Sequence, residues 1–384
     1  MNNIWNLRQS DSADVQLIHS QAGVSLITAH LLVQRGIKNA EDAHYFLNGG
    51  WDELIDPWQM QGMYAAVERI KKAIEGRERV ILFGDYDVDG VCSIVILQEC
   101  LQIMGCRVDY RVADRFKHGY GLNNEIVREL ASQGYQLLIT VDCGISSVEE
   151  TELAHSLGMD VIITDHHIPA AIQPSAQAVI NPKNDGIKRI ANLAGAGVVF
   201  KLATALADNR IAREKIEEWL ELVALATVAD IVPLLDENRL LVKYGLQFMA
   251  QSKRVGLAAL IEAVGLAGQP IQSWQIAYLL APPLNSAGRL DTARISIELL
   301  LCADKQLARD QALKLCQLNN QRRQIEDSIY REAREQIESI LTPTGEPILI
   351  VGGDGWHEGV IGIVASRLAA VYNRPTIVIC WSGD

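Results

Sequence analysis

The stretch RVILFGDYDVDG, from Arg79 to Gly90, decides the fold. It begins with a short apolar run typical of a buried strand and ends in three alternating aspartates, Asp85, Asp87 and Asp89. The apolar segment that follows, from Val91 to Met104, is compatible with a helix and ends at a glycine. The stretch therefore predicts a strand and a helix with carboxylates clustered at the turn between them.

The same alternation recurs further along the chain. Leu137–Val141, Asp160–Thr164 and Ala176–Asn181 are expected strands, and Ser147–Leu157 is an expected helix. Strands that alternate with helices predict an α/β fold, with a mostly parallel sheet covered by helices on both faces. In such sheets ligands bind beyond the carboxyl ends of the strands.

Acidic and histidine residues follow the three clearest strands. Asp142 follows the second strand, and Asp165, His166 and His167 follow the third. Carboxylates this close repel each other unless cations neutralise them, and carboxylates with imidazole suit Mn²⁺ or Mg²⁺. Zinc is less favoured because no thiolate is placed to join the set. The first motif alone leaves an ordinary Asp-Gly turn as an alternative.

The rest of the chain divides by composition. We expect an N-terminal helical cap over residues 1–75 and a catalytic domain over 76–303, helical from Gly195 with breaks at Pro233, Gly265 and Pro282-Pro283. Residues 304–342 are charged and lack breakers, which predicts a long exposed connecting helix. Residues 343–384 begin a second α/β domain that is too short for a core of its own.

Composition limits the classes of partner and location. The net charge of −12 argues against wrapping nucleic acid by general surface attraction, although a carboxylate pocket lowers the total while its cations attract phosphate. Seven cysteines without a C-x-x-C pair are expected to be buried thiols in a reducing compartment. No signal peptide or apolar membrane span is evident, so we expect a cytoplasmic protein without a membrane partner.

Four motifs occur in order: GDYDVDG (84–90), TVDCG (140–144), TDHH (164–167) and VADIVPL (228–234). They resemble the four signature motifs of the DHH phosphoesterases. The aspartate-only form of the first motif is similar to that of the single-strand-specific exonucleases, and differs from the histidine-containing form of the oligoribonuclease and cyclic-dinucleotide relatives. Weaker similarity in HGYGL, PPLNSAGRL and GWHEGVIGIVASRL extends the resemblance over roughly residues 75 to 380.

The resemblance implies a site with two divalent ions, Mn²⁺ or Mg²⁺. The implied metal ligands are Asp87, Asp89, Asp142, His166 and Asp230, with Asp142 bridging the ions. Asp85 would orient the site, and His167 would contact the scissile phosphate or assist proton transfer. Without the resemblance, Asp230 would be read as a helix-end or salt-bridged aspartate.

Three further segments are candidates for binding phosphate. They are a loop with Arg115, His118 and Tyr120, a polar loop with Asn285, Ser286 and Arg289, and a glycine-rich helix start at His357. Each has an ordinary alternative, namely a solvated arginine, a domain-packing turn or a simple helix start.

The implied activity is removal of 5′-mononucleotides from the 5′ end of single-stranded DNA, used in repair and recombination, with single-strand-binding protein and a helicase as partners. Two alternatives are a phosphodiesterase for short oligonucleotides or cyclic dinucleotides and an inactive replication scaffold of the same fold. The later glycine- and histidine-rich motif and the OB-fold of the family are absent, so we expect a catalytic core. We expect their absence to affect substrate binding more than the metal site.

Overall fold

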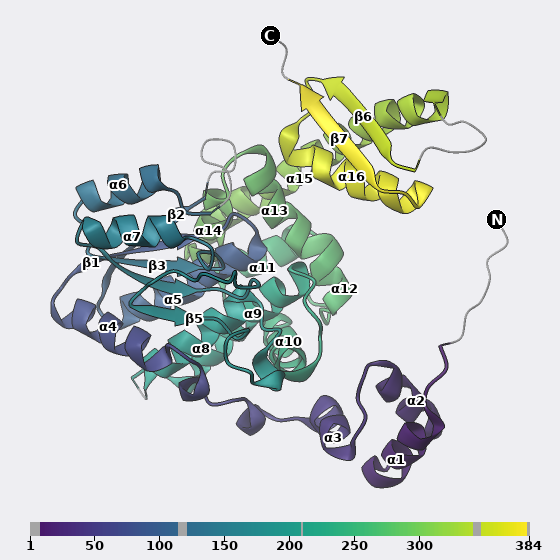
Figure 1. Ribbon diagram of the computed structural model, residues 1–384, viewed down its shortest axis with the longest axis horizontal. Coiled ribbons are helices and arrows are strands. Elements are labelled where there is room, and N and C mark those ends of the chain that lie inside the picture. The colour runs from purple at the N-terminus through teal and green to yellow at the C-terminus, as the bar shows by residue number, and fades with distance from the viewer. Residues whose placement is uncertain (1–7, 114–120, 209, 341–346, 382–384) are drawn as a thin grey trace.

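A five-stranded parallel sheet in the order β2-β1-β3-β4-β5 lies at the centre of the catalytic region (Figure 1). This computed structural model describes residues 8–113, 121–208, 210–340 and 347–381. The strands are β1 Arg79–Gly84, β2 Arg107–Val112, β3 Leu137–Val141, β4 Asp160–Thr164 and β5 Ala178–Ile180. Because β2 lies on one side of β1 and β3 on the other, the strand order reverses at β1. Ligands bind at such a switch point in open α/β sheets.

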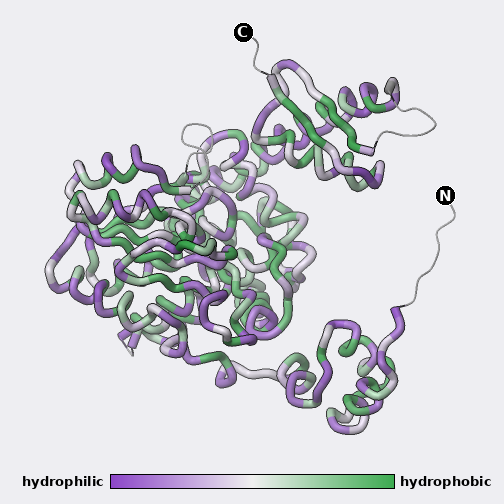
Figure 2. Tube along the Cα trace, in the orientation of Figure 1, coloured by the Kyte–Doolittle hydropathy of each residue, from purple (hydrophilic) through white to green (hydrophobic). Residues whose placement is uncertain are grey.

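Helices cover both faces of this sheet, which confirms the predicted fold class. Helices α5 (Val88–Ile103) and α8 (Gly195–Ala207) lie on one face, and α6 (Asn124–Ser132) and α7 (Val148–Ser156) on the other (Figure 1). The inner strands are hydrophobic along their length (Figure 2), as expected for strands buried on both faces.

The helical half of the catalytic region packs against α5 and α8. Its elements are α9 Arg213–Ala229, α10 Asp236–Met249, α11 Val255–Ala263, α12 Ser273–Gln275, a π-helical turn Ile276–Leu280, α13 Ala281–Leu290 and α14 Arg294–Leu301. The predicted break at Pro282 and Pro283 is wrong, because both prolines lie in the first turn of α13. The π-helical turn that runs directly into α13 is the local irregularity that accommodates them within a continuous helical segment.

The N-terminal residues form two different parts. Helices α1 (Ser12–Ala22), α2 (Leu26–Gln34) and α3 (Ala40–Asn48) share a small core of their own. Short 3₁₀ turns at Trp51–Glu53 and Pro57–Gln59 lead to α4 (Met63–Glu75), whose buried residues belong to the main core. We therefore propose that the N-terminal unit ends near residue 50, earlier than the sequence suggested.

Helix α15 (Lys305–Ile340) joins two cores. Its first half contributes Ala308, Ala312 and Leu315 to the main core, while Ile329 and Ala333 lie in a smaller core with the C-terminal unit. Most of its other residues are exposed or half-buried. The C-terminal unit consists of β6 Leu349–Asp354, α16 Glu358–Tyr372 and β7 Thr376–Trp381, with β6 and β7 parallel.

The seven cysteines are unpaired, but only Cys92, Cys100 and Cys106 are buried and the other four are half-buried. Burial raises the pKa of the Cys106 thiol to about 11, so it is protonated at neutral pH. Within the described ranges, no helix combines the length and apolar character needed to cross a bilayer.

Candidate metal centre

The carboxyl ends of β1, β3 and β4 bring the predicted acidic and histidine residues together. Nε2 of His166, after β4, lies 3.1 Å from Oδ1 of Asp142, 3.7 Å from Oδ2 of Asp89 and 3.6 Å from Oδ2 of Asp230. Asp230 comes from a distant part of the chain, as the residue that ends α9. One imidazole nitrogen therefore faces three carboxylates from three different segments.

A second group of carboxylates adjoins the first. Asp85, Asp87 and Asp142 each place an oxygen within 4.8 Å of the others, an arrangement that could hold a metal ion. Asp89, His166 and Asp230 form another such group. Asp142 contacts His166 and also belongs to the aspartate group, so it lies between the two candidate ion sites.

The electrostatics of the cluster are unfavourable without cations. Burial, followed by repulsion from Asp87, raises the pKa of Asp89 to about 7. Burial, followed by the Asp89 carboxylate, raises the pKa of Asp230 to about 6 and holds that of Asp142 well above its usual value. Burial lowers the pKa of His166, which keeps this imidazole neutral and available as a ligand.

Backbone geometry directs the aspartates into the centre. Asp87 caps α5 by accepting hydrogen bonds from the backbone N–H groups of Asp89 and Gly90. Asp89 accepts two bonds of 2.7 Å from the backbone at the start of α8. Asp142 has a left-handed backbone with φ of 59°, and a Cβ at Gly195 would lie 2.6 Å from its Oδ1. Only glycine at position 195 leaves room for the Asp142 carboxylate.

Asp165 is a functional residue to which the sequence analysis gave no role. Its Oδ1 lies 2.7 Å from Nδ1 of His167 and also accepts the backbone N–H groups of His166 and His167, while its Oδ2 accepts that of Ile145. The hydrogen bond that the Asp165 carboxylate accepts from His167 raises the pKa of His167 to about 9, so the half-exposed imidazole is positively charged at neutral pH. Its position inside the TDHH motif could have indicated this role from the sequence.

Three of the predicted phosphate-binding residues have other contacts. Asn285, Ser286 and Arg289 lie in helix α13, so the prediction of a polar loop is wrong. Asn285 accepts a hydrogen bond from the Val88 backbone at the start of α5, and Ser286 is fully buried and donates to the Pro283 carbonyl. Arg289 donates to the Gly359 carbonyl of the C-terminal unit, 3.2 Å away.

The remaining candidates are His357, in the C-terminal unit, and the three residues of the predicted loop before α6. His357 caps α16, where its Nδ1 accepts from the Gly359 backbone at 3.1 Å. Arg115, His118 and Tyr120 lie outside the described residues.

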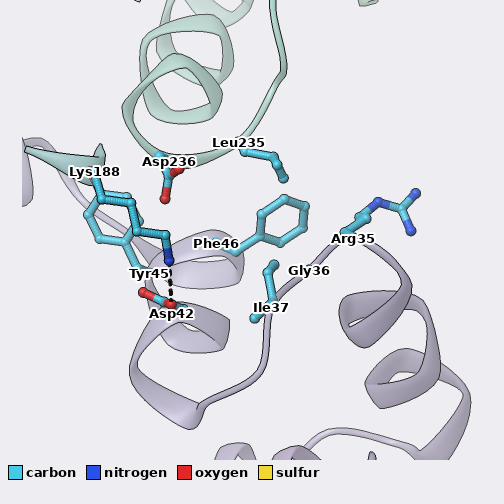
Figure 3. Close-up of a pocket in the computed structure, with 9 residues that line it drawn as sticks. All are labelled: Arg35, Gly36, Ile37, Asp42, Tyr45, Phe46, Lys188, Leu235 and Asp236. Carbon is cyan, nitrogen blue, oxygen red and sulfur yellow. Dashed lines mark hydrogen bonds and ion pairs between the residues drawn. The ribbon is translucent and has the colours of Figure 1, made fainter. Parts of the chain in front are cut away.

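A cavity of about 450 Å³ opens beside the cluster. Asp85, Asp142 and His167 line one side, and Ser146, Ser147 and Glu150 line another at the start of α7. A smaller pocket of about 60 Å³ lies between α3 and the start of α10 (Figure 3). It contains the Lys188–Asp42 ion pair of 3.2 Å and none of the candidate metal ligands. It belongs to the attachment of the N-terminal unit.

The parallel sheet, the switch point at β1 and the cluster of five aspartates and a neutral histidine define a domain of the DHH type. The family model "DHH family, N-terminal domain" matches residues 79–227.

Proteins of similar sequence identify one family within the DHH class. The chain is 39% identical to "Single-stranded-DNA-specific exonuclease RecJ" of Bacillus subtilis over 98% of this chain and 47% of that protein. Its identity to the protein of the same name from Dickeya dadantii is 37%, over 100% of this chain and 68% of that one. The chain belongs to the RecJ family of DHH proteins. It spans about half the length of the Bacillus subtilis relative.

Solved structures agree with this placement. RecJ of Thermus thermophilus in complex with Mn²⁺ superposes with a TM-score of 0.82 at 29% identity, over 97% of this chain and 53% of that chain. An exonuclease RecJ bound to manganese gives a TM-score of 0.74 at 33% identity, over 84% of this chain and 80% of that chain.

Proposed function

We propose that the chain is a phosphodiester hydrolase that uses two divalent cations, Mn²⁺ or Mg²⁺, to release mononucleotides from the 5′ end of single-stranded DNA. The observation that carries the proposal is the orphaned pair at the centre of the cluster. Asp142 Oδ1 and His166 Nε2 are buried 3.1 Å apart, yet within the described structure neither makes a hydrogen bond to the other or to a third group. Such groups are costly to bury unless a cation compensates them.

The residues present fit two ions. Asp89, Asp142, His166 and Asp230 would hold one, and Asp85, Asp87 and Asp142 the other, with Asp142 shared. Asp85 thus becomes a candidate ligand in addition to orienting the site. An oxygen-rich set with one imidazole favours Mn²⁺ and accepts Mg²⁺, the ions bound in the related structures. Two such ions lower the pKa of bound water and neutralise charge on the phosphate.

The protein's own groups would position the substrate. His167, kept protonated by Asp165, presents a cationic ring at the cavity beside Asp85 and Asp142. There it would donate a hydrogen bond to a phosphate oxygen or a proton to the leaving oxygen. The cavity has the size of small-molecule sites, which suits a terminal nucleotide.

The proposed substrate is supported by the relatives, and the proposed 5′ polarity rests on the family resemblance of the sequence motifs. Those proteins carry the name single-stranded-DNA-specific exonuclease, which supports single-stranded DNA as the substrate here. Such an activity would need partners that cover or supply single strands, namely single-strand-binding protein and a helicase. A DNA substrate also fits the expected cytoplasmic location.

The test uses single strands labelled at the 5′ or the 3′ end, duplexes and dinucleotides, each with Mn²⁺, Mg²⁺ or EDTA. We expect mononucleotide release from the 5′ end of single strands, lost in EDTA and in Asp142→Ala but retained in the exposed control Asp52→Asn. Activity that survives both EDTA and Asp142→Ala would overturn the two-cation proposal. Release from the 3′ end, or cleavage of dinucleotides alone, would overturn the substrate assignment.

A further inference from the structure

Ile231 combines two unfavourable features beside the metal centre. It directly follows Asp230, its backbone has φ of 61°, and its side chain is 87% exposed. A β-branched residue in this left-handed region is a conformational outlier. The other described non-glycine residues with positive φ are Arg77, Asp142, Asp208, Asp236 and Asn373, none of which is β-branched.

The backbone conformation has an ordinary cause, but the side chain does not. Helix α9 ends at Asp230, and the N–H of Ile231 bonds the Val228 carbonyl at 3.4 Å. The residue after a helix end often adopts this conformation, and it is usually glycine or asparagine. Either residue would satisfy the turn with less strain and without exposing an apolar side chain. An isoleucine here therefore calls for a separate explanation, and strained residues of this kind cluster at functional sites.

A second exposed isoleucine flanks the same centre. Ile168 is 82% exposed and directly follows His167. Oδ2 of Asp230 lies 3.6 Å from Nε2 of His166. Ile231 is one residue after Asp230, and Ile168 is two residues after His166, so both isoleucines are close in the chain to the two members of this contact. The flat, apolar face of a nucleobase matches such side chains, which enzymes use to hold unpaired bases.

We propose that Ile231 is a nucleobase contact that positions a single strand at the metal centre, and that Ile168, the second exposed isoleucine next to the cluster in the chain, supports it. This inference rests on the proposed function and adds a substrate-positioning residue to it. The side chain contacts a base of the strand whose phosphodiester lies over the cations. A base paired in a duplex keeps its faces stacked on its neighbours, so the contact favours unpaired strands.

The test compares Ile231→Asn, which keeps the left-handed backbone and removes the apolar surface, with the conservative Ile231→Val. Ile103→Asn is the matched control, an isoleucine 50% exposed at the opposite end of α5 from Asp87. Burying part of an aliphatic side chain against a base predicts that KM for single-stranded DNA rises about 10-fold in Ile231→Asn, with a smaller change in kcat. Ile231→Val and the control keep the wild-type KM. Mn²⁺ affinity stays within about 2-fold, and Tm is unchanged or raised by about 1–3 °C.

A strand with abasic sites at its 5′ end shows whether the partner is a base. We expect wild type and Ile231→Asn to have equal KM on that strand, because the contact is already missing. Two results would overturn the nucleobase contact and leave the proposed function intact. One is that wild type and Ile231→Asn have equal KM on the normal strand, and the other is that their KM values still differ on the abasic strand. A wild-type protein that releases nothing from single strands would instead refute the proposed function.

Discussion

Asp142 is the residue on which catalysis and stability make opposing demands. It is 2% exposed, has a left-handed backbone and faces other carboxylates, so its charge is unfavourable until a cation arrives. Metal binding and folding are coupled in such sites, because the ions stabilise the state that binds them.

Replacing Asp142 by asparagine should therefore separate the two demands. We expect hydrolysis to fall by about 1000-fold or more, since bound metals supply several kcal/mol of transition-state stabilisation. In EDTA, however, the variant should melt at a higher temperature than wild type, because one buried charge has been removed. Thermal melts with and without Mn²⁺ measure both effects. A variant that melts lower than wild type in EDTA would contradict this account.

Asp165 allows a second prediction at the residue scale. Asp165→Asn loses the charge that orients and protonates His167 but keeps a side chain of similar shape. We expect a loss of kcat of about 10–100-fold, the usual effect of removing a partner that orients a functional group. Mn²⁺ affinity, measured by calorimetry, should change much less than kcat. An equal loss of both would show that Asp165 supports the metal ligands and not His167.

The residues of the centre were predictable where the signal was local. Asp85, Asp87, Asp89, Asp142 and His166 follow strands whose ends meet at one edge of a parallel sheet. Contacts between distant segments could not be read from the sequence. The space that Gly195 leaves for Asp142, and the hydrogen bond that Asn285 accepts from the start of α5, arise only when the chain folds.

Among the elements, α5 depends on a contact from the other half of the catalytic region. Asn285 of α13 accepts the Val88 N–H at 3.0 Å, just after the residue that caps α5.

Asn285→Ala should leave this half-buried donor unsatisfied. We expect a loss of about 1–3 kcal/mol in the free energy of unfolding, measured by urea titration. Because the same turn carries Asp87 and Asp89, Mn²⁺ affinity should weaken as well. Asn320→Ala, at an exposed position of α15, serves as control. Unchanged metal affinity in Asn285→Ala would show that the turn holds its shape without α13.

Two elements show why sequence patterns fail. Strand β2 was not predicted because its residues RVDYRV mix charges with apolar side chains, which an edge position allows. Helix α13 was read as a loop because two adjacent prolines suggested a break, although a preceding π-helical turn accommodates both within a continuous helical segment. By contrast, the buried strands and the long charged helix have strong patterns and were predicted.

At the scale of the whole molecule, one buried ion network ties three helices together. Glu99 of α5 pairs with Arg254 at 2.6 Å before α11, and with Lys215 at 2.9 Å and the Trp219 indole of α9. Although burial opposes it, the hydrogen bond and charge of Arg254 hold the pKa of Glu99 at about 2.

This network should make stability depend on acid pH. The folded pKa of Glu99 lies below its unfolded value, so its contribution is fully present above about pH 4.5 and is lost as the pH falls toward 2. Glu99→Gln should cost about 3 kcal/mol at pH 7, and the difference from wild type should shrink below about pH 4. Urea unfolding at several pH values measures this. Glu262→Gln, in the exposed pair with Arg309, is the control and should change little. A constant difference across pH would contradict the role of the Glu99 charge.

Helix α15 has a mechanical consequence. Its 36 residues form a rod of about 54 Å, clamped in the main core at one end and in the small C-terminal core at the other. If the helix stays rigid, a tilt of about 5° at its catalytic end displaces its C-terminal end by about 5 Å. Small adjustments around α13, which packs on α15 and places Asn285 at the turn bearing Asp87, would therefore be transmitted as large displacements of the C-terminal unit.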